Sequence, residues 1–235
     1  MTASLDLTVP ANLRDVGGLT TADGRTLRRG VLLRSDAPQP GDVSPVTPGS
    51  VIDLRSPRET EGRAHPLTGR AEIHVVPLGA SLAPDVIAAT PAAERDLGWA
   101  YRLLVADAAA EIARIVEIVA TAPAPVLVHC AAGKDRTGII VATVLRLVGV
   151  PRAQVLADYA ATNENLEPLF ARLRASGAHL PGVDDDAEDL LGVDPAALEA
   201  VLDDLESHPG GLRGYLVANG ADPTHLDAIT ARLLG

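Results

Sequence analysis

Short apolar runs alternate with longer segments of helical periodicity along the first 150 residues. The runs at 51–54, 73–76 and 125–129 are short and almost uninterrupted, which is typical of buried strands. Residues 99–120 instead place apolar side chains at helical spacing, and a second apolar helical pattern covers 138–148. Strands that alternate with helices favour an α/β fold, with a mostly parallel central sheet flanked by helices.

Turn residues divide the rest of the N-terminal region. The pair Asp23-Gly24 lies between Leu19 and the run 26–33, and an Asp-Gly turn at this spacing predicts a hairpin. Residues 56–70 are polar and interrupted by proline and glycine, so we expect a loop with a short helix there.

After residue 149 the pattern predicts helices only. Proline lies just inside three of their starts, as Pro151, Pro195 and Pro223, and the last two follow an aspartate that can cap the free N–H groups. The pair Asn219-Gly220 predicts a C-cap between the last two helices.

Composition narrows the class of protein. Of the 235 residues, 47% are apolar but only 2% are aromatic, so we expect a core of leucine, valine, isoleucine and alanine. A single cysteine excludes an intramolecular disulfide and a thiol-rich metal site. The net charge of −11 argues against nucleic acid as a partner, but it leaves a locally positive cleft open.

Signals for membranes or export are not evident in the sequence. No stretch approaches the roughly 20 apolar residues of a membrane span. Residues 1–6 contain neither the basic region nor the apolar segment of a signal peptide. We therefore expect no integral membrane segment and a cytoplasmic location, with export by a signal-less route left open. The sequence does not indicate an oligomeric state.

The cysteine begins the most informative motif of the chain. Residues 129–138 read His-Cys-Ala-Ala-Gly-Lys-Asp-Arg-Thr-Gly, between the strand at 125–129 and the helix at 138–148. The order strand, tight loop, helix places the thiol at the start of the loop. Backbone N–H groups of such a loop, with the positive end of the following helix, stabilise a thiolate and hold phosphate oxygens.

The side chains of this motif suit phosphoryl transfer through a covalent cysteine intermediate. Cys130 is the candidate nucleophile. Arg136 offers a planar guanidinium that can grip two phosphate oxygens and follow their charge into the transition state. A threonine hydroxyl next to this arginine can donate a hydrogen bond to the sulfur when it leaves. The predicted substrate-binding residues are Ala131, Ala132, Gly133, Lys134 and Thr137, with Asp53 from a neighbouring strand.

These residues resemble a known family. The pattern His-Cys-x5-Arg-Thr resembles the phosphate-binding loop of the cysteine-dependent protein tyrosine phosphatases. The full ten-residue motif is similar to that of a narrower branch, the bacterial tyrosine/lipid phosphatases. The resemblance runs from about Asn12 to the C-terminus and includes the segments 12–18, 33–36, 52–56 and 211–216.

The resemblance implies one phosphatase domain over residues 1–235 that needs no metal or cofactor. It implies a helical lid over the active site, which we expect at about 163–206. We interpret His129 as a structural residue that orients the loop and tunes the thiolate through a backbone contact. The implied substrates are phosphotyrosine, together with phosphoserine/threonine and phosphoinositides. Lys134, in a Gly-Lys-Asp-Arg loop, suits substrates with extra negative charge; the alternative is a solvated loop cation.

The general acid is less clearly marked. Protonating the leaving oxygen needs a carboxyl group near the phosphate. Tyrosine phosphatases usually supply it from a mobile loop that contains Trp-Pro-Asp, a tripeptide that this chain lacks. The candidates are Asp135, inside the motif, and Asp53, at a strand end. We favour Asp135, because the sequence alone places it beside the phosphate. Its alternative is a structural carboxylate, and the alternative for Asp53 is a buried ion pair with Arg55.

Other polar and aromatic residues receive structural interpretations. Most aromatic side chains are expected to pack in the core or in the lid. Arg14-Asp15 and Arg34-Ser35-Asp36 are interpreted as ion pairs of the surface or of the hairpin, with pocket walls as the alternative.

A cysteine-dependent phosphatase is the leading hypothesis, and two others remain. The first is a catalytically silent module that binds phosphate or phosphoinositide, which is less favoured because binding alone needs no thiol. The second is an arsenate reductase or sulfurtransferase. The lack of a second cysteine weakens the reductase, and Arg136 with Thr137 suits phosphate better than persulfide.

Overall fold

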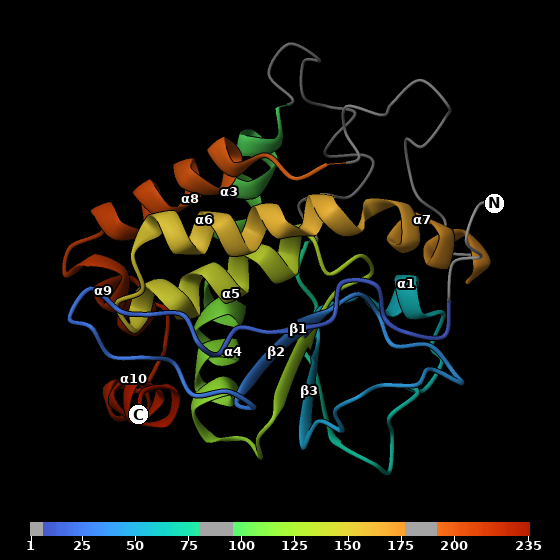
Figure 1. The fold of residues 1–235 in the computed structure, drawn as a ribbon. Coiled ribbons are helices and arrows are strands. Elements are labelled where there is room, and N and C mark those ends of the chain that lie inside the picture. Colours follow the sequence, from blue (N-terminus) through green and yellow to red (C-terminus); the bar gives the residue numbers. More distant parts are fainter. Residues whose placement is uncertain (1–6, 80–95, 177–191) are drawn as a thin grey trace.

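A five-stranded sheet lies at the centre of the computed structural model, which describes residues 7–79, 96–176 and 192–235 (Figure 1). Its strands are β1 (Arg14–Asp15), β2 (Leu32–Ser35), β3 (Ser50–Asp53), β4 (Glu72–Val75) and β5 (Val126–His129). They are ordered β1-β2-β5-β3-β4, and all neighbours pair in parallel except β1 with β2. The predicted mostly parallel sheet is therefore confirmed.

The three central strands end level with one another. In the sheet register, Ser35 of β2 and Asp53 of β3 both pair with His129 of β5. The loops that follow these strands consequently meet at one edge of the sheet. Ligand sites of parallel sheets form at this edge, outside the carboxyl ends of the strands.

Helices cover one face of the sheet, and loops cover most of the other (Figure 1). The short helix α1 lies on the loop side, whereas α5 runs from the edge of β5 through the middle of the helical layer. The helices are α1 (Pro57–Thr60), α3 (Leu97–Asp107), α4 (Ala109–Thr121), α5 (Asp135–Leu147), α6 (Arg152–Ala160), the 3-10 helix η3 (Ala161–Asn165), α7 (Leu166–Ala175), α8 (Pro195–Ser207), α9 (Gly211–Ala218) and α10 (Pro223–Leu233).

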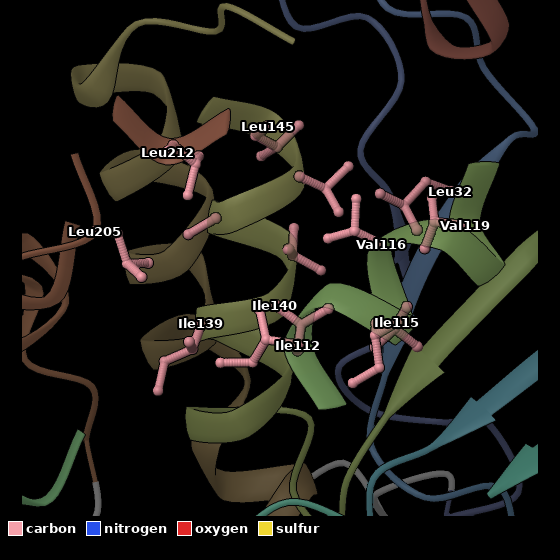
Figure 2. Close-up of a cluster of buried hydrophobic side chains, with 14 of the residues drawn as sticks. Leu32, Ile112, Ile115, Val116, Val119, Ile139, Ile140, Leu145, Leu205 and Leu212 are labelled. Atoms are coloured by element: carbon pink, nitrogen blue, oxygen red, sulfur yellow. The ribbon is translucent and has the colours of Figure 1, made fainter. Parts of the chain in front are cut away.

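Strand side chains divide between the two faces with the period of two expected for a sheet. Ile52 and Val126 join the large core beneath the helices, whereas Val51 and Leu127 belong to a smaller cluster that loop residues cover. Figure 2 shows the large core, where Ile112 of α4 lies beside Ile140 of α5. Because aromatic residues are scarce, branched aliphatic side chains supply this burial, at roughly 1.5–3 kcal/mol each.

The three runs that the sequence predicted as strands lie within one residue of β3, β4 and β5. The hairpin expected around Asp23-Gly24 is reduced to a single bridge between Thr20 and Thr26, and β2 begins only at Leu32. Two helix boundaries were wrong. The apolar stripe at 99–120 forms two helices that separate at Ala108, because α3 packs against α8 while α4 packs against α10. Helix α5 begins at Asp135 rather than at residue 138, so Asp135 and Arg136 lie in its first turn.

The C-terminal helices largely follow their capping signals. Asp194 and Asp222 cap α8 and α10, each followed by proline in the first turn, while Pro151 precedes α6 instead of lying inside it. Residues 177–191 of the predicted lid lie outside the described residues, so the lid stays a prediction. None of the described helices is long and apolar enough to cross a membrane.

Candidate active site

The loop after β5 begins with a buried thiol. Cys130 is only 2% exposed and follows directly on the last residue of the strand. The side chain of His129 lies behind the loop, where its Nδ1 is 2.9 Å from the Cys130 carbonyl oxygen. Since a carbonyl can only accept, Nδ1 carries the proton and donates it. The next carbonyl, that of Ala131, accepts from the backbone N–H of Ala37 at 2.9 Å.

The following two carbonyls of the loop are also bound from outside. The side-chain amide of Asn12 donates to Gly133 O at 2.9 Å and to Ala132 O at 3.3 Å. The guanidinium of Arg34 donates to the same Gly133 oxygen, again at 2.9 Å. Two donors from distant parts of the chain therefore converge on one peptide group of the loop.

These bonds orient the N–H groups of residues 131–134, which we call the anion cradle. A trans peptide holds its C=O and the next N–H in opposite directions. Four consecutive carbonyls that face the supporting residues therefore turn the four following N–H groups toward the inside of the loop. Convergent N–H groups at the start of a helix form a site for an anion.

Gly133 makes this turn of the loop sterically feasible. Its φ is +65°, and a Cβ at this position would lie 2.1 Å from the backbone oxygen of Ser35. No side chain fits at that distance. The loop thus packs directly against the end of β2.

A buried ion pair supports the cradle from behind. Arg34 is fully buried, and its guanidinium donates to Asp158 of α6 at 2.6 Å; Arg14 binds the other carboxylate oxygen at 2.9 Å. Burial alone would raise the pKa of Asp158, but the two arginines lower it. The interpretation of Arg14 and Arg34 as surface or hairpin ion pairs is therefore wrong, because both reach across to a helix behind the loop.

Glu59 holds the guanidinium of Arg136. Both carboxylate oxygens accept from it, at 2.8 and 2.6 Å, and the Leu78 carbonyl lies at 3.3 Å. Although burial would lower the pKa of Arg136, the bonds to Glu59 and the neighbouring Cys130 raise it. Glu59 is fixed in turn, since it closes a capping box with Ser56 at the start of α1.

Asp135 is bound by a phenol. Tyr101 of α3 donates to its Oδ1, and the Tyr159 hydroxyl lies 2.6 Å from that of Tyr101. Oδ2 of Asp135 is 3.7 Å from the Lys134 ammonium, and about a third of the Asp135 side chain is exposed. Most aromatic side chains were expected to pack in the core or in the lid, and these two are indeed buried, but their hydroxyls also form hydrogen bonds at the first turn of α5.

A comparison with protein families decides the identity. The model described as the tyrosine phosphatase family matches residues 5–235. The chain belongs to the tyrosine phosphatase family. This confirms the resemblance read from the loop motif, and with it the fold and the enzyme class.

Three relatives agree with the family. The triple specificity protein phosphatase PtpB of Mycobacterium tuberculosis is 30% identical over 270 aligned residues, covering 95% of this chain and 96% of that protein. A Cupriavidus necator protein that carries the name of a tyrosine-protein phosphatase is 31% identical over 88% of this chain and 80% of its own length. A tyrosine-protein phosphatase of Nostoc commune is 40% identical over 46% of this chain and 38% of its own length.

Asp53, the second acid candidate of the phosphatase, is already paired. Both of its oxygens accept from the Arg55 guanidinium, at 2.9 and 2.8 Å, and its side chain is almost completely buried. Burial opposes ionisation, but Arg55 and the nearby His129 lower its pKa. This geometry matches the buried ion pair weighed as the alternative for Asp53.

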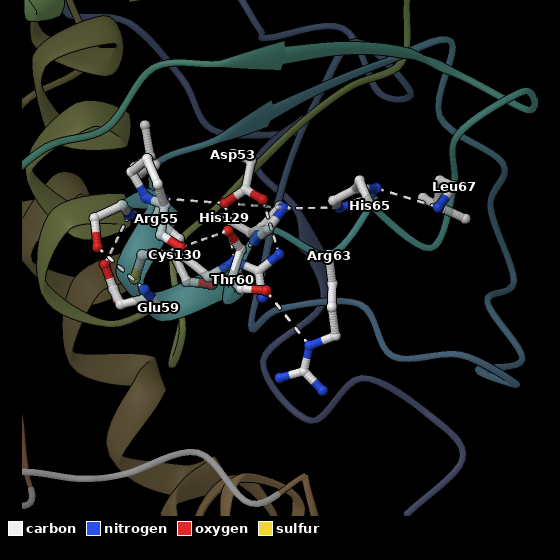
Figure 3. A network of polar contacts seen from close by, with 12 residues as sticks. Asp53, Arg55, Glu59, Thr60, Arg63, His65, Leu67, His129 and Cys130 are labelled. Carbon is white, nitrogen blue, oxygen red and sulfur yellow. Dashed lines mark hydrogen bonds and ion pairs between the residues drawn. The ribbon is translucent and has the colours of Figure 1, made fainter.

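His65 extends the polar network behind the phosphatase loop (Figure 3). The Leu67 N–H donates to His65 Nδ1 at 3.1 Å, and His65 Nε2 lies 3.1 Å from His129 Nε2. Because Nδ1 of His65 accepts, Nε2 carries the proton and donates to His129. The result is a directed chain of hydrogen bonds that ends at the Cys130 carbonyl.

The same cluster has the residue types of a metal site. Asp53, His65 and His129 offer ligand atoms within 4.8 Å of one another. Binding would require an unprotonated Nε2 on both histidines. Leu67 fixes the opposite tautomer of His65, and Arg55 occupies the carboxylate. The residues therefore fit a hydrogen-bonded chain better than a metal.

Lys134 and Thr137 complete the predicted site. The Lys134 ammonium is mostly buried and donates to the Gly192 carbonyl at 3.0 Å, so it is not a solvated loop cation. The Thr137 hydroxyl is fully buried and has no hydrogen-bond partner among the described residues. Its helix neighbour Thr143 bonds instead to the carbonyl four residues earlier. For Thr137 that carbonyl is Gly133, which Asn12 and Arg34 already occupy.

Several functional residues escaped the sequence reasoning, and their signals were of unequal strength. The capping-box pattern at 56–59 predicts that the Glu59 side chain is held at the start of a helix, but it does not indicate that Glu59 contacts Arg136. Asn12 and Arg34 lie in segments that carry the family resemblance, and that resemblance is the signal that could have marked them. The missed residues are Asn12, Arg34, Glu59, His65, Tyr101, Asp158 and Tyr159.

Proposed function

We propose that this phosphatase hydrolyses phosphotyrosine, and also phosphoserine, phosphothreonine and phosphoinositides, through a phosphocysteine intermediate. The anion cradle carries the proposal. Four inward N–H groups beside Cys130 and Arg136 match the three equatorial oxygens of a phosphoryl group in transfer, and donors placed where charge develops are the largest source of such catalysis.

In the first step, the Cys130 thiolate attacks phosphorus, an S–P bond forms and the P–O bond to the substrate breaks. Asp135 gives its proton to the leaving oxygen. Arg136 binds two of the equatorial oxygens, and Glu59 keeps its planar fork in the required orientation. The free alcohol or phenol then departs.

In the second step, a water molecule attacks the phosphocysteine. The Asp135 carboxylate takes a proton from this water, the S–P bond breaks and the thiolate is restored, with inorganic phosphate as product. The Thr137 hydroxyl, which has no partner among the described residues, supports this step as a donor to the departing sulfur. Asp53 is assigned a structural role, since Arg55 holds both of its oxygens.

Two observations favour a broad substrate range. Lys134 adds a cation beside the cradle, which suits substrates with more than one phosphate. The printed name of the mycobacterial relative gives it triple specificity. We extend this breadth to the present chain as part of the proposal.

The test is phosphate release without added metal from a phosphotyrosine peptide, phosphoserine and phosphothreonine peptides, and soluble phosphoinositides. Turnover that is lost in Cys130→Ser, together with phosphate trapped on the wild-type enzyme by acid quench, would support the mechanism. In Lys134→Met, the fold-loss of phosphoinositide turnover should be at least ten times the fold-loss of phosphotyrosine turnover. Phosphate binding without turnover of any substrate would instead mark the chain as a silent anion receptor.

A further inference from the structure

We propose that Tyr101 is a positioning residue that orients Asp135 as the general acid and that Tyr159 supports it. This inference rests on the proposed function, since it assigns a partner to the acid of that reaction. It concerns side chains from three helices that meet at the first turn of α5: Tyr101 from α3, Tyr159 from α6 and Asp135 itself.

The hydrogen bonds of this triad have a fixed direction. When Asp135 is ionised, its carboxylate only accepts, so the single proton of the Tyr101 hydroxyl points to Oδ1. When Asp135 carries its proton on Oδ2, Oδ1 is still an acceptor for the same hydroxyl. The Tyr101 oxygen then accepts from the Tyr159 hydroxyl, 2.6 Å away. Burial raises the pKa of both phenols, so they remain neutral donors.

Packing holds the two phenols in place. Tyr101 and Tyr159 are each only 1% exposed. The ring of Tyr159 lies directly against Gly138, where a Cβ would approach two ring carbons to 2.7 Å. A side chain at this position of α5 would displace the ring, so the glycine admits the phenol beneath the loop.

The triad distinguishes the two oxygens of the acid. Tyr101 occupies Oδ1 as a donor, which leaves Oδ2 as the atom that carries the proton for the leaving group. After the proton is transferred, the charge on Asp135 is met by a donor that is already oriented. A donor prepared in this way needs no reorganisation in the transition state. The Tyr101–Asp135 hydrogen bond therefore has two effects: it orients the acid, and it stabilises the carboxylate that forms when the proton is transferred.

A merely structural phenol would behave differently. Loss of packing or of a buried hydrogen bond would lower turnover of every substrate to a similar degree. Loss of an oriented acid lowers the turnover rate more when the leaving group is poorer. It therefore slows phenyl phosphate strongly and an activated aryl phosphate little.

The experiment compares kcat for phenyl phosphate and p-nitrophenyl phosphate in Tyr101→Phe, Tyr159→Phe, Asp135→Asn and the double variant Tyr101→Phe/Asp135→Asn. We expect Tyr101→Phe to lose about tenfold on phenyl phosphate and less than twofold on the activated ester. Tyr159→Phe should show the same selectivity at about threefold, and the double variant should be no slower than Asp135→Asn. The matched control is Tyr215→Phe, which also removes a tyrosine hydroxyl hydrogen-bonded at α3, in this case to the Val105 carbonyl, and which should change neither rate.

The outcomes separate the inference from the proposed function. Equal losses on both substrates, or a double variant much slower than Asp135→Asn, would overturn the role of Tyr101 while the phosphatase mechanism stands. Should Tyr101→Phe fail to fold, the selectivity of Tyr159→Phe decides the question. Turnover that survives Cys130→Ser would overturn the proposed function itself. If Asp135→Asn slows both substrates equally, Asp135 is not the general acid, and the role proposed for Tyr101 is overturned with it.

Discussion

The guanidinium of Arg136 is held by both carboxylate oxygens of Glu59, a residue 77 positions away in the sequence. Glu59 also accepts from the backbone N–H of Ser56 and so closes the capping box of α1. The orientation of the arginine at the phosphate site therefore depends on how a four-residue helix begins on the far side of the loop. Under the proposed mechanism, this coupling gives Glu59 a role in catalysis without contact with substrate.

Replacing Glu59 by glutamine should lower kcat by about 10- to 100-fold, because a charge-assisted hydrogen bond worth roughly 1.5–3 kcal/mol is weakened. The KM should change less, since the positive charge of Arg136 remains. Steady-state kinetics on an aryl phosphate measure both. Glu61→Gln is the matched control, because its partner Arg63 is exposed and their pair lies on the surface. Equal kinetics in the two variants would show that Arg136 needs no support.

The sequence predicted the part of the site that is contiguous. A strand, a tight loop and a helix follow one another within residues 125–148, so the positions of Cys130 and Arg136 follow from local pattern alone. The helix start was misjudged because Lys134 provides no capping side chain, and the first turn contains no apolar residue to mark it.

The supporting residues could not be derived from local pattern. Asn12 and Arg34 contact the Gly133 carbonyl across 121 and 99 positions, and no periodicity encodes such a contact. An arginine between Leu33 and Ser35 favours a surface interpretation, because charged side chains are rarely buried without a partner. Its partner, Asp158, lies on a helix whose position depends on the whole fold.

Replacing Gly133 by alanine should abolish the cradle. The variant residue would need the left-handed backbone conformation and would clash with Ser35 O, so we expect a loss of at least about 100-fold in kcat/KM. Gly24→Ala is the control, since its φ is +85° but no atom lies within 4 Å of the added Cβ. Both variants should lose about 1 kcal/mol or more of folding free energy, measured by urea unfolding. Unchanged activity in Gly133→Ala would refute the fixed loop geometry.

Replacing Thr137 by valine should separate stability from activity. Its buried hydroxyl has no partner among the described residues, so a methyl group should raise the free energy of unfolding by about 1 kcal/mol. Breakdown of the phosphocysteine should slow about tenfold, which appears as a burst in rapid-mixing kinetics with p-nitrophenyl phosphate. Thr143→Val should do the opposite, losing about 1 kcal/mol with no burst, because its hydroxyl bonds to Ile139 O. A destabilised Thr137→Val would indicate a bonded hydroxyl.

Acid should weaken the folded state through His129. Complete burial lowers its pKa from 6.5 to about 4, against the attraction of Asp53 and with the help of Arg55 and His65. Between these values the unfolded imidazole binds a proton that the folded one does not, so the free energy of unfolding falls as the pH decreases from about 7 to 4. The shift corresponds to up to about 3 kcal/mol.

Urea unfolding of wild type and His129→Asn across this pH range tests the prediction, because asparagine keeps a donor for the Cys130 carbonyl but does not titrate. The variant should show a shallower decline of stability toward pH 4. His225→Gln is the control, because this histidine is half-exposed and pairs with Glu117 at the surface. Its free energy of unfolding should depend on pH as in the wild type, apart from the small contribution of one surface ion pair. His65 adds to the wild-type slope in the same direction, since burial lowers its pKa as well. Parallel curves for wild type and His129→Asn would mean that His129 binds its proton in the folded state and that the directed hydrogen-bond chain behind the loop does not exist.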